Sequence, residues 1–216
     1  MKVPFEIGLV AILRTPTKES AREIATELVS AGVKLIEFTT TTPGALDLIE
    51  EFSANKDIYI GLGTATSKEH VNGGKKAGAQ FIISPHTDEE VIRETKKLEL
   101  ISIPGVASPT DVGNAIKFGA DALKFFPAKS LGTDYLKAVR EPFPGQIWMA
   151  TGGITIESVG DWMAAGCTAV GLGGPLTKGG VGEIANRVKA FQDTIRAAKR
   201  SEEHTSELQS RLHLVC

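Results

Sequence analysis

Two ionisable side chains of this sequence stand inside apolar runs, where a charged group is least expected. Lys124 lies in the run 122–126 and is followed directly by Phe125 and Phe126. A lysine is seldom buried without a partner or a task, and burial lowers the pKa of an amine, which then becomes a nucleophile toward a ketone. We expect both phenylalanines to keep the amine away from water. The alternative is a structural lysine whose stem lies on the phenylalanines while its ammonium reaches solvent.

Glu37 is the second such residue, in the apolar run 35–38. Considered alone, it is typical of an ion pair at the end of a strand. Together with Lys124 it forms either a structural pair or a nucleophile with its proton shuttle. Imine chemistry needs a shuttle, because protons move when the carbinolamine forms, when it loses water and when a substrate hydroxyl is deprotonated during bond cleavage.

Two glycine turns follow late apolar runs, Thr-Gly-Gly-Ile at 151–154 and Gly-Leu-Gly-Gly at 171–174. One glycine pair alone indicates a tight turn. Two pairs after consecutive late strands favour a phosphate site built from backbone N–H groups and a helix start.

Three further polar residues close apolar runs. Arg14 is either a surface arginine or a fork for a substrate carboxylate, and Thr64 is either a turn residue or a second donor to that carboxylate. His86 has no second ligand at metal-binding spacing, so we interpret it as a polar loop residue. No metal site is predicted.

The elements that must position these residues recur regularly along the chain. Eight short apolar runs alternate with segments of helical periodicity, most of which open with a capping residue such as Ser108. Near-continuous apolar runs are typical of parallel strands covered on both faces. The pattern predicts an α/β protein, a single (β/α)8 TIM barrel over residues 1–200, in preference to a doubly wound sheet. The predicted strands are Leu9–Leu13, Lys34–Thr39, Ile58–Leu62, Gln80–Ser84, Leu100–Ile103, Ala122–Phe126, Ile147–Ala150 and Ala169–Leu172.

Composition narrows the class of protein. The 216 residues are 42% hydrophobic and 23% charged, and the formal net charge of −2 resides wholly in residues 201–216. Residues 1–200 therefore carry no net charge and offer no broad basic surface to nucleic acid or to an anionic membrane, so neither is expected as a partner. Two cysteines, Cys167 and Cys216, form no disulfide framework, and the run 7–13 is too short for a secretory signal. These features predict a cytoplasmic protein.

Residues 201–216 break the strand–helix rhythm and have no clear apolar face. We interpret them as a non-native or disordered tail and assign no function to His204, His213 or Cys216.

The strand-end motifs, taken together, resemble the 2-keto-3-deoxy-6-phosphogluconate and 2-keto-3-deoxy-6-phosphogalactonate aldolases, which are class I pyruvate aldolases. The resemblance covers about residues 7–198. It rests on eight fragments in register: Ala11-Ile-Leu-Arg14, Ile36-Glu-Phe-Thr39, Gly61-Leu-Gly-Thr64, Ile83-Ser-Pro85, Ile103-Pro-Gly105, Leu123-Lys-Phe-Phe-Pro-Ala128, Thr151-Gly-Gly-Ile154 and Gly171-Leu-Gly-Gly174.

The resemblance implies a role for each matching residue. Lys124 would form the Schiff base and Glu37 would be the general acid/base. The substrate-binding positions would be Arg14, Thr64, Pro85, Thr151, Gly152, Gly153, Gly173 and Gly174. Among these, Thr64 would contact the pyruvate carboxylate, and the four glycines would line the phosphate site.

Two positions depart from the family pattern. Thr41 stands where some gluconate-type members have an arginine, which leaves Arg14 as the anchor of the substrate, as in galactonate-type members. Gly174 stands where many members have serine. The missing hydroxyl should weaken phosphate binding by about 1 kcal/mol, since the backbone N–H remains.

The implied function is reversible cleavage of a 2-keto-3-deoxy-6-phospho sugar acid, of gluconate or galactonate type, to pyruvate and glyceraldehyde 3-phosphate, as in Entner–Doudoroff carbohydrate metabolism. A homotrimer is implied as well, and no metal or organic cofactor is expected. The alternatives are another TIM-barrel enzyme on a phosphorylated ligand, either an isomerase or a synthase, and a non-catalytic structural trimeric barrel.

Overall fold

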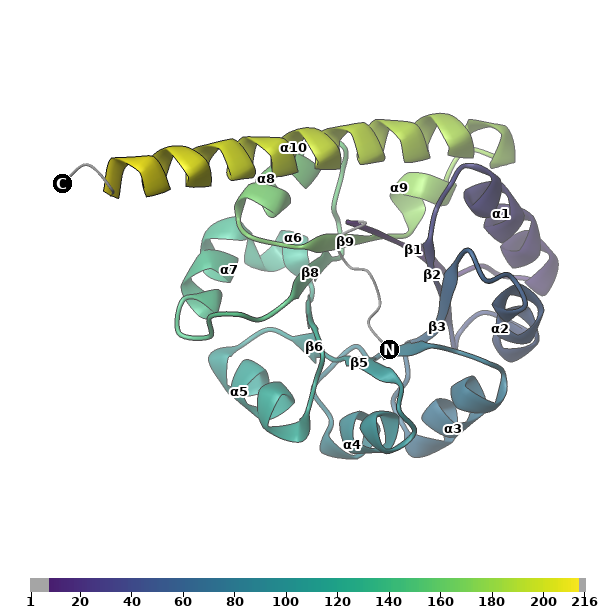
Figure 1. The fold of residues 1–216 in the computed structure, drawn as a ribbon. Helices are drawn as coiled ribbons and strands as arrows, with labels where there is room; N and C mark the ends of the chain where they lie inside the picture. The colour runs from purple at the N-terminus through teal and green to yellow at the C-terminus, as the bar shows by residue number, and fades with distance from the viewer. Residues whose placement is uncertain (1–7, 214–216) are drawn as a thin grey trace.

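The computed structural model describes the backbone of residues 8–213 and the side chains of residues 8–201. Within this range one parallel sheet curls into a barrel surrounded by helices (Figure 1). β1 pairs with both β2 and β9, which closes the sheet between its first and last strands. The strands are β1 (Leu9–Leu13), β2 (Leu35–Thr39), β3 (Tyr59–Gly63), β4 (Phe81–Ile83), β5 (Ile101–Ile103), β6 (Gly105–Val106), β7 (Leu123–Phe125), β8 (Trp148–Thr151) and β9 (Ala169–Leu172).

The predicted fifth strand, Leu100–Ile103, is observed as β5 and ends before Pro104, and β6, a further short strand that the sequence did not predict, follows it. β5 pairs with β4 and β6 pairs with β7, so the two pieces occupy one place in the barrel. Proline has no N–H to give to a ladder, but the Pro104 carbonyl still accepts a hydrogen bond from the Lys124 N–H at 2.9 Å. The nine strands of the described residues therefore amount to eight barrel positions, and the predicted (β/α)8 fold is confirmed.

A helix or pair of helices follows nearly every strand, as Figure 1 shows. Side-chain caps form at several of the predicted helix starts: Thr17 and Ser67 accept hydrogen bonds from first-turn N–H groups, and Ser108 forms a capping box with Asp111. The starts of α2 and α8 have no side-chain cap among the described residues. The helices are α1 (Lys18–Ser30), α2 (Ala45–Ser53), α3 (Lys68–Lys76), α4 (Glu89–Lys97), α5 (Pro109–Phe118), α6 (Ala128–Leu131), α7 (Thr133–Arg140), α8 (Val159–Ala164), α9 (Gly174–Thr177), the 3-10 helix η2 (Val181–Glu183) and α10 (Ile184–His213).

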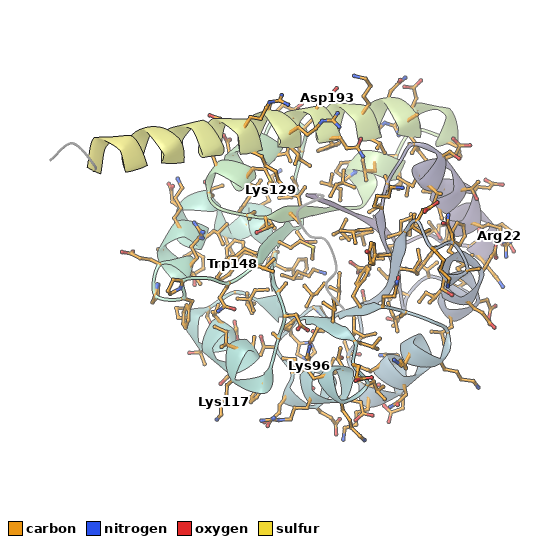
Figure 2. The ribbon with its side chains drawn as sticks, viewed as in Figure 1. Arg22, Lys96, Lys117, Lys129, Trp148 and Asp193 are labelled. Carbon is orange, nitrogen blue, oxygen red and sulfur yellow. The ribbon has the colours of Figure 1, made fainter. Side chains whose placement is uncertain are left out.

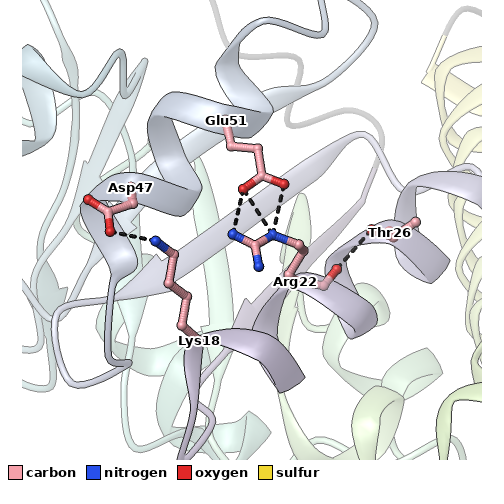
Figure 3. A network of polar contacts seen from close by, with 5 residues as sticks. All are labelled: Lys18, Arg22, Thr26, Asp47 and Glu51. Atoms are coloured by element: carbon pink, nitrogen blue, oxygen red, sulfur yellow. Dashed lines mark hydrogen bonds and ion pairs between the residues drawn. The ribbon is translucent and has the colours of Figure 1, made fainter.

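Ion pairs join the first two helices on the outer surface of the barrel (Figure 3). Lys18 of α1 lies 2.6 Å from Asp47 of α2, and Arg22 lies 2.9 Å from Glu51. Such exposed pairs contribute little to the stability of a fold, because solvent screens their charges. The outer rim also carries the exposed side chain of Lys117 on α5 (Figure 2).

Strand alternation separates two apolar layers. Side chains such as Phe38, Phe125 and Trp148 face the helices and form the larger core. The inward-facing set fills the barrel itself and consists of Val10, Leu35, Phe81, Ile83, Ile101, Ile103, Ala122, Met149 and Ala169. Because successive residues of a strand point to opposite faces, the residue two positions beyond an inward-facing residue also points inward.

Helix α10 packs along the outside of the barrel, against α8 and α1, and continues beyond it (Figure 1). Its residues Ile184, Val188, Phe191 and Ile195 are buried. The helical backbone runs on to His213, within the segment 201–216, and residues 214–216 lie outside the described residues. The interpretation of this segment as a non-native or disordered tail stays a prediction. No helix in the described part of the chain is long and apolar enough to cross a membrane.

Candidate active site

Glu37 lies deep in the barrel on β2, two residues beyond the inward-facing Leu35. Its side chain is fully buried. Strand register places it opposite Ile12 of β1 and Gly61 of β3. Gly63 lies two residues further along β3, and a Cβ atom added there would overlap the carboxyl group of Glu37. A glycine at position 63 therefore leaves the space that the carboxyl group occupies.

The Glu37 carboxyl is isolated from hydrogen-bond partners. Neither of its oxygens has one among the described residues. Burial raises the pKa of Glu37 above its ordinary value of 4.5, while the positive charges of Lys124 and Arg14 act in the opposite direction and are outweighed. A buried carboxyl without partners is costly to the fold. Such a group is suited to exchange hydrogen bonds and protons with a bound substrate.

Lys124 also faces the barrel interior, from β7, and its side chain is almost fully buried at 7% exposure. Its Nζ lies 5.2 Å from the centre of the Phe126 ring, a cation–π distance. Phe126 is two residues further along and 36% exposed. Phe125 instead packs among the helices against Tyr135 and Trp162. The expectation that both phenylalanines cover the amine is therefore wrong, because strand alternation turns Phe125 away.

Lys124 and Glu37 act on each other through charge and not through contact. The Lys124 charge lowers the pKa of Glu37, yet the described residues include no ion pair between the two within 4.0 Å. A structural salt bridge would bring the ammonium and carboxylate into contact. The lack of such a contact among the described residues favours the catalytic interpretation of the pair.

Arg14 and Thr64 connect the carboxyl ends of β1 and β3. The Arg14 guanidinium donates to the Thr64 hydroxyl at 3.0 Å, and Thr40 donates to the Thr64 carbonyl at 2.9 Å. Thr64 has a φ of 57°, in the left-handed region that few non-glycine residues adopt. Arg14 is exposed and has no carboxylate partner among the described residues. Its remaining N–H groups are thus free to bind an anionic ligand.

A cavity of about 450 Å³ opens at the ends of β1, β8 and β9. Its charged lining residues are both cationic, and its turn at Gly152 and Gly153 has φ values of 100° and 76°, which glycine tolerates best. The Thr151 hydroxyl is buried without a hydrogen-bond partner among the described residues. The cavity is lined by Ile12, Arg14, Thr151, Gly152, Gly153, Ile154, Gly171, Leu172, Gly173, Gly174, Pro175, Thr177 and Lys178.

Most of the residues that the sequence singled out meet at this end of the barrel. Six line the cavity, namely Arg14, Thr151, Gly152, Gly153, Gly173 and Gly174. The other four, namely Lys124, Glu37, Thr64 and Pro85, are not among the lining residues. Pro85 follows β4, and a Cβ atom on Gly105 would overlap its carbonyl. His86 is exposed and stands 4.0 Å from Asp88. No cluster of metal-ligating side chains occurs among the described residues.

Sequence reasoning missed Lys178, the second cation of the cavity. It lies four residues after Gly174, which is about one helical turn, so a short helix after the glycine turn brings the two together. That spacing was the available signal. It was overlooked because Lys178 stands outside every apolar run.

The chain matches the family profile of KDPG and KHG aldolase over residues 4–192. It is 33% identical to the 2-dehydro-3-deoxy-6-phosphogalactonate aldolase of Escherichia coli K12 over 204 residues, which cover 92% of this chain and 99% of the relative.

Solved structures agree with this match. The native KDPGal structure superposes with a TM-score of 0.85 at 32% identity, covering 93% of this chain and 98% of the other. A KDPG aldolase from Legionella pneumophila, with pyruvate captured as a covalent carbinolamine intermediate, gives a TM-score of 0.74 at 28% identity, covering 90% of this chain and 95% of the other. This chain is an aldolase that belongs to the KDPG and KHG aldolase family.

Proposed function

We propose that this aldolase cleaves a 2-keto-3-deoxy-6-phospho sugar acid, of gluconate or galactonate type, to pyruvate and glyceraldehyde 3-phosphate. The observation that carries the proposal is the relation of Lys124 to Glu37. A buried amine and a buried, unpartnered carboxyl interact through charge across the barrel without forming an ion pair. Both the E. coli relative and the native KDPGal structure are named for the galactonate-type substrate.

The reaction begins with attack of the Lys124 amine on the C2 ketone of the substrate. The carbinolamine loses water and becomes an iminium, which withdraws electrons from the C3–C4 bond. As this bond breaks, the C4 hydroxyl loses its proton and glyceraldehyde 3-phosphate leaves. The remaining enamine takes a proton at C3, and hydrolysis releases pyruvate. In the Legionella relative, pyruvate was captured as a carbinolamine, which corresponds to the last covalent species of this sequence before pyruvate is released.

Glu37 moves the protons of these steps. Burial raises the pKa of its carboxyl, so the group holds a proton more readily than an exposed glutamate and can give it to the departing water. After that transfer the carboxylate accepts the proton of the C4 hydroxyl. Neither carboxyl oxygen has a hydrogen-bond partner among the described residues, so either oxygen can exchange a proton with the substrate.

The ends of the substrate are held by different groups. Arg14 and Thr64, already joined at 3.0 Å, bind the carboxylate as a preset pair of donors. The glycine turns at 152–153 and 173–174 line the cavity that takes the phosphoryl end, and the Thr151 hydroxyl meets a substrate hydroxyl. Pro85 borders the substrate from the β4 side. The cavity volume of about 450 Å³ lies within the range of small-molecule sites.

Borohydride reduction in the presence of pyruvate tests the Schiff base directly. We expect peptide mass mapping to find a reduced pyruvate adduct on Lys124, and Lys124→Met to abolish it. Lys117→Met, at an exposed lysine on α5, is the matched control and should keep the adduct. An unmodified Lys124 would refute the mechanism. Comparing kcat/KM for the gluconate and galactonate substrates then identifies the preferred epimer.

We further propose that the enzyme is a cytoplasmic homotrimer, as the family resemblance implies. Large apolar side chains remain exposed on the single chain, with Leu46 at 43% and Tyr135 at 39%, and association would cover such surface. The sequence has only two cysteines and no disulfide framework, which suits a reducing compartment. Light scattering should give about three times the 22.9 kDa chain mass.

A further inference from the structure

We propose that Lys178 selects phosphorylated substrates, and that Gly174 makes this possible by leaving room for the lysine stem. The inference rests on the proposed function and adds to it the residue that recognises the phosphoryl group. In this chain the Lys178 ammonium would bind the phosphoryl group in place of the side-chain hydroxyl that many relatives carry at position 174.

Lys178 stands between two cavities. It lines the 450 Å³ cavity that contains Arg14 and Thr151, and it also lines a neighbouring cavity of about 480 Å³. Gly174 and Pro175 also line both cavities. The short helix α9 that carries these residues lies between the barrel and α10 (Figure 1). The lysine is thus placed at the outer edge of the cavity.

The stem of Lys178 folds back across Gly174. The Lys178 N–H donates to the Gly174 carbonyl at 2.9 Å, which closes the turn. A Cβ atom added at Gly174 would lie 3.2 Å from Cε, 3.5 Å from Cδ and 3.7 Å from Cγ of Lys178. The first of these distances is tighter than an ordinary van der Waals contact, so a side chain at 174 would require the lysine stem to shift by a few tenths of an ångström. Glycine at 174 lets the stem lie against the turn without this shift.

The charges of the cavity are arranged for a ligand with two anionic ends. Arg14 and Lys178 are its charged lining residues, and no carboxylate is among the lining residues. Arg14 is bound to Thr64 at the β1–β3 side, whereas the Lys178 ammonium has no partner among the described residues. Glu157 lines the neighbouring cavity but forms no ion pair with Lys178 within the described part of the chain. The ammonium is available to a phosphoryl group, which carries nearly two negative charges.

Steady-state kinetics with paired substrates tests the assignment. The 6-phospho substrate and the same keto acid without its phosphate should be cleaved by the parent, by Lys178→Met and by Lys178→Arg. We expect Lys178→Met to reduce the phosphorylated-to-unphosphorylated ratio of kcat/KM by about tenfold, through KM rather than kcat, because one charge-assisted hydrogen bond is lost. Lys178→Arg should restore most of the ratio. The charge-matched control is Lys117→Met on α5, which should leave the ratio unchanged.

Binding of inorganic phosphate, measured by calorimetry, separates this proposal from the proposed function. If the parent cleaves no keto sugar acid but Lys178→Met binds phosphate about tenfold more weakly than the parent, the substrate assignment fails and the role of Lys178 stands. If Lys178→Met matches Lys117→Met in both the kinetic ratio and phosphate affinity, the role of Lys178 is overturned.

Discussion

Gly63 and Glu37 share one space inside the barrel, because a Cβ atom at position 63 would overlap the carboxyl group of Glu37. The two residues lie on the neighbouring strands β2 and β3, both facing inward. The absence of a side chain on one strand is therefore the condition for a buried carboxyl on the next. Glu37 can be displaced without being mutated.

Gly63→Ala should consequently impair catalysis by displacing the Glu37 carboxyl, much as a substitution of Glu37 itself would. We expect kcat/KM to fall about a hundredfold or more as the carboxyl is pushed from its position, with a loss of about 1–3 kcal/mol in the free energy of unfolding. Steady-state kinetics and urea denaturation measure the two effects. The control is Gly113→Ala in α5, where an added Cβ meets nothing within 4 Å. It should stabilise the helix by up to about 1 kcal/mol and leave kinetics unchanged. Full activity of Gly63→Ala would contradict the account.

Glu37→Gln should separate proton transfer from packing, since the amide keeps the size of the carboxyl. We expect kcat to fall by about 10²–10⁴-fold, because the general acid/base is lost. Lys124 remains, so prolonged incubation with pyruvate and borohydride should still label it, but more slowly. Single-turnover cleavage and the rate of labelling measure both effects. Unchanged kcat with a raised KM would assign Glu37 to binding alone.

Stability should depend on pH through the same carboxyl. Burial raises the pKa of Glu37 in the folded state above its ordinary value of 4.5. The resulting stabilisation is fully present below the unfolded pKa and is lost as pH rises through the folded pKa. Glu37→Gln cannot ionise, so its unfolding free energy relative to the parent should increase across that window. Urea denaturation of the ligand-free proteins from pH 4.5 to pH 8 measures this difference. A difference that does not change with pH would count against a raised pKa of Glu37.

Thr151→Val should show whether the Thr151 hydroxyl forms a hydrogen bond with the bound substrate. In the ligand-free protein its Oγ1 has no partner among the described residues, so removal should cost little stability. With substrate bound, the loss of one hydrogen bond of about 1 kcal/mol should raise KM about fivefold. Thr95→Val is the matched buried control, because the Thr95 hydroxyl is already bonded to the Val91 carbonyl at 2.7 Å in α4. Equal KM values for the parent and Thr151→Val would show that the hydroxyl does not touch substrate.

Strand alternation could have predicted more of the site than was inferred. Once Lys124 is placed inward, the period of two places Phe126 inward and Phe125 outward, as the structure shows. The break between β5 and β6 at Pro104 also follows from the missing N–H of proline. The bond from Arg14 to Thr64 could not have been foreseen, because it joins residues 50 positions apart.

The sequence by itself determined the repeat of strand and helix, the helix caps such as Ser108, and the presence of Lys124 and Glu37 in buried strands. These features depend on local periodicity and on the hydrogen bonding of neighbouring residues, which a linear chain already contains. Tertiary structure alone decided that Lys124 and Glu37 stay apart, that Gly63 leaves space for the carboxyl, and that Lys178 joins Arg14 at one cavity. Each of these relations depends on strand register and barrel closure, since a slip of one residue would turn every side chain of a strand to the opposite face.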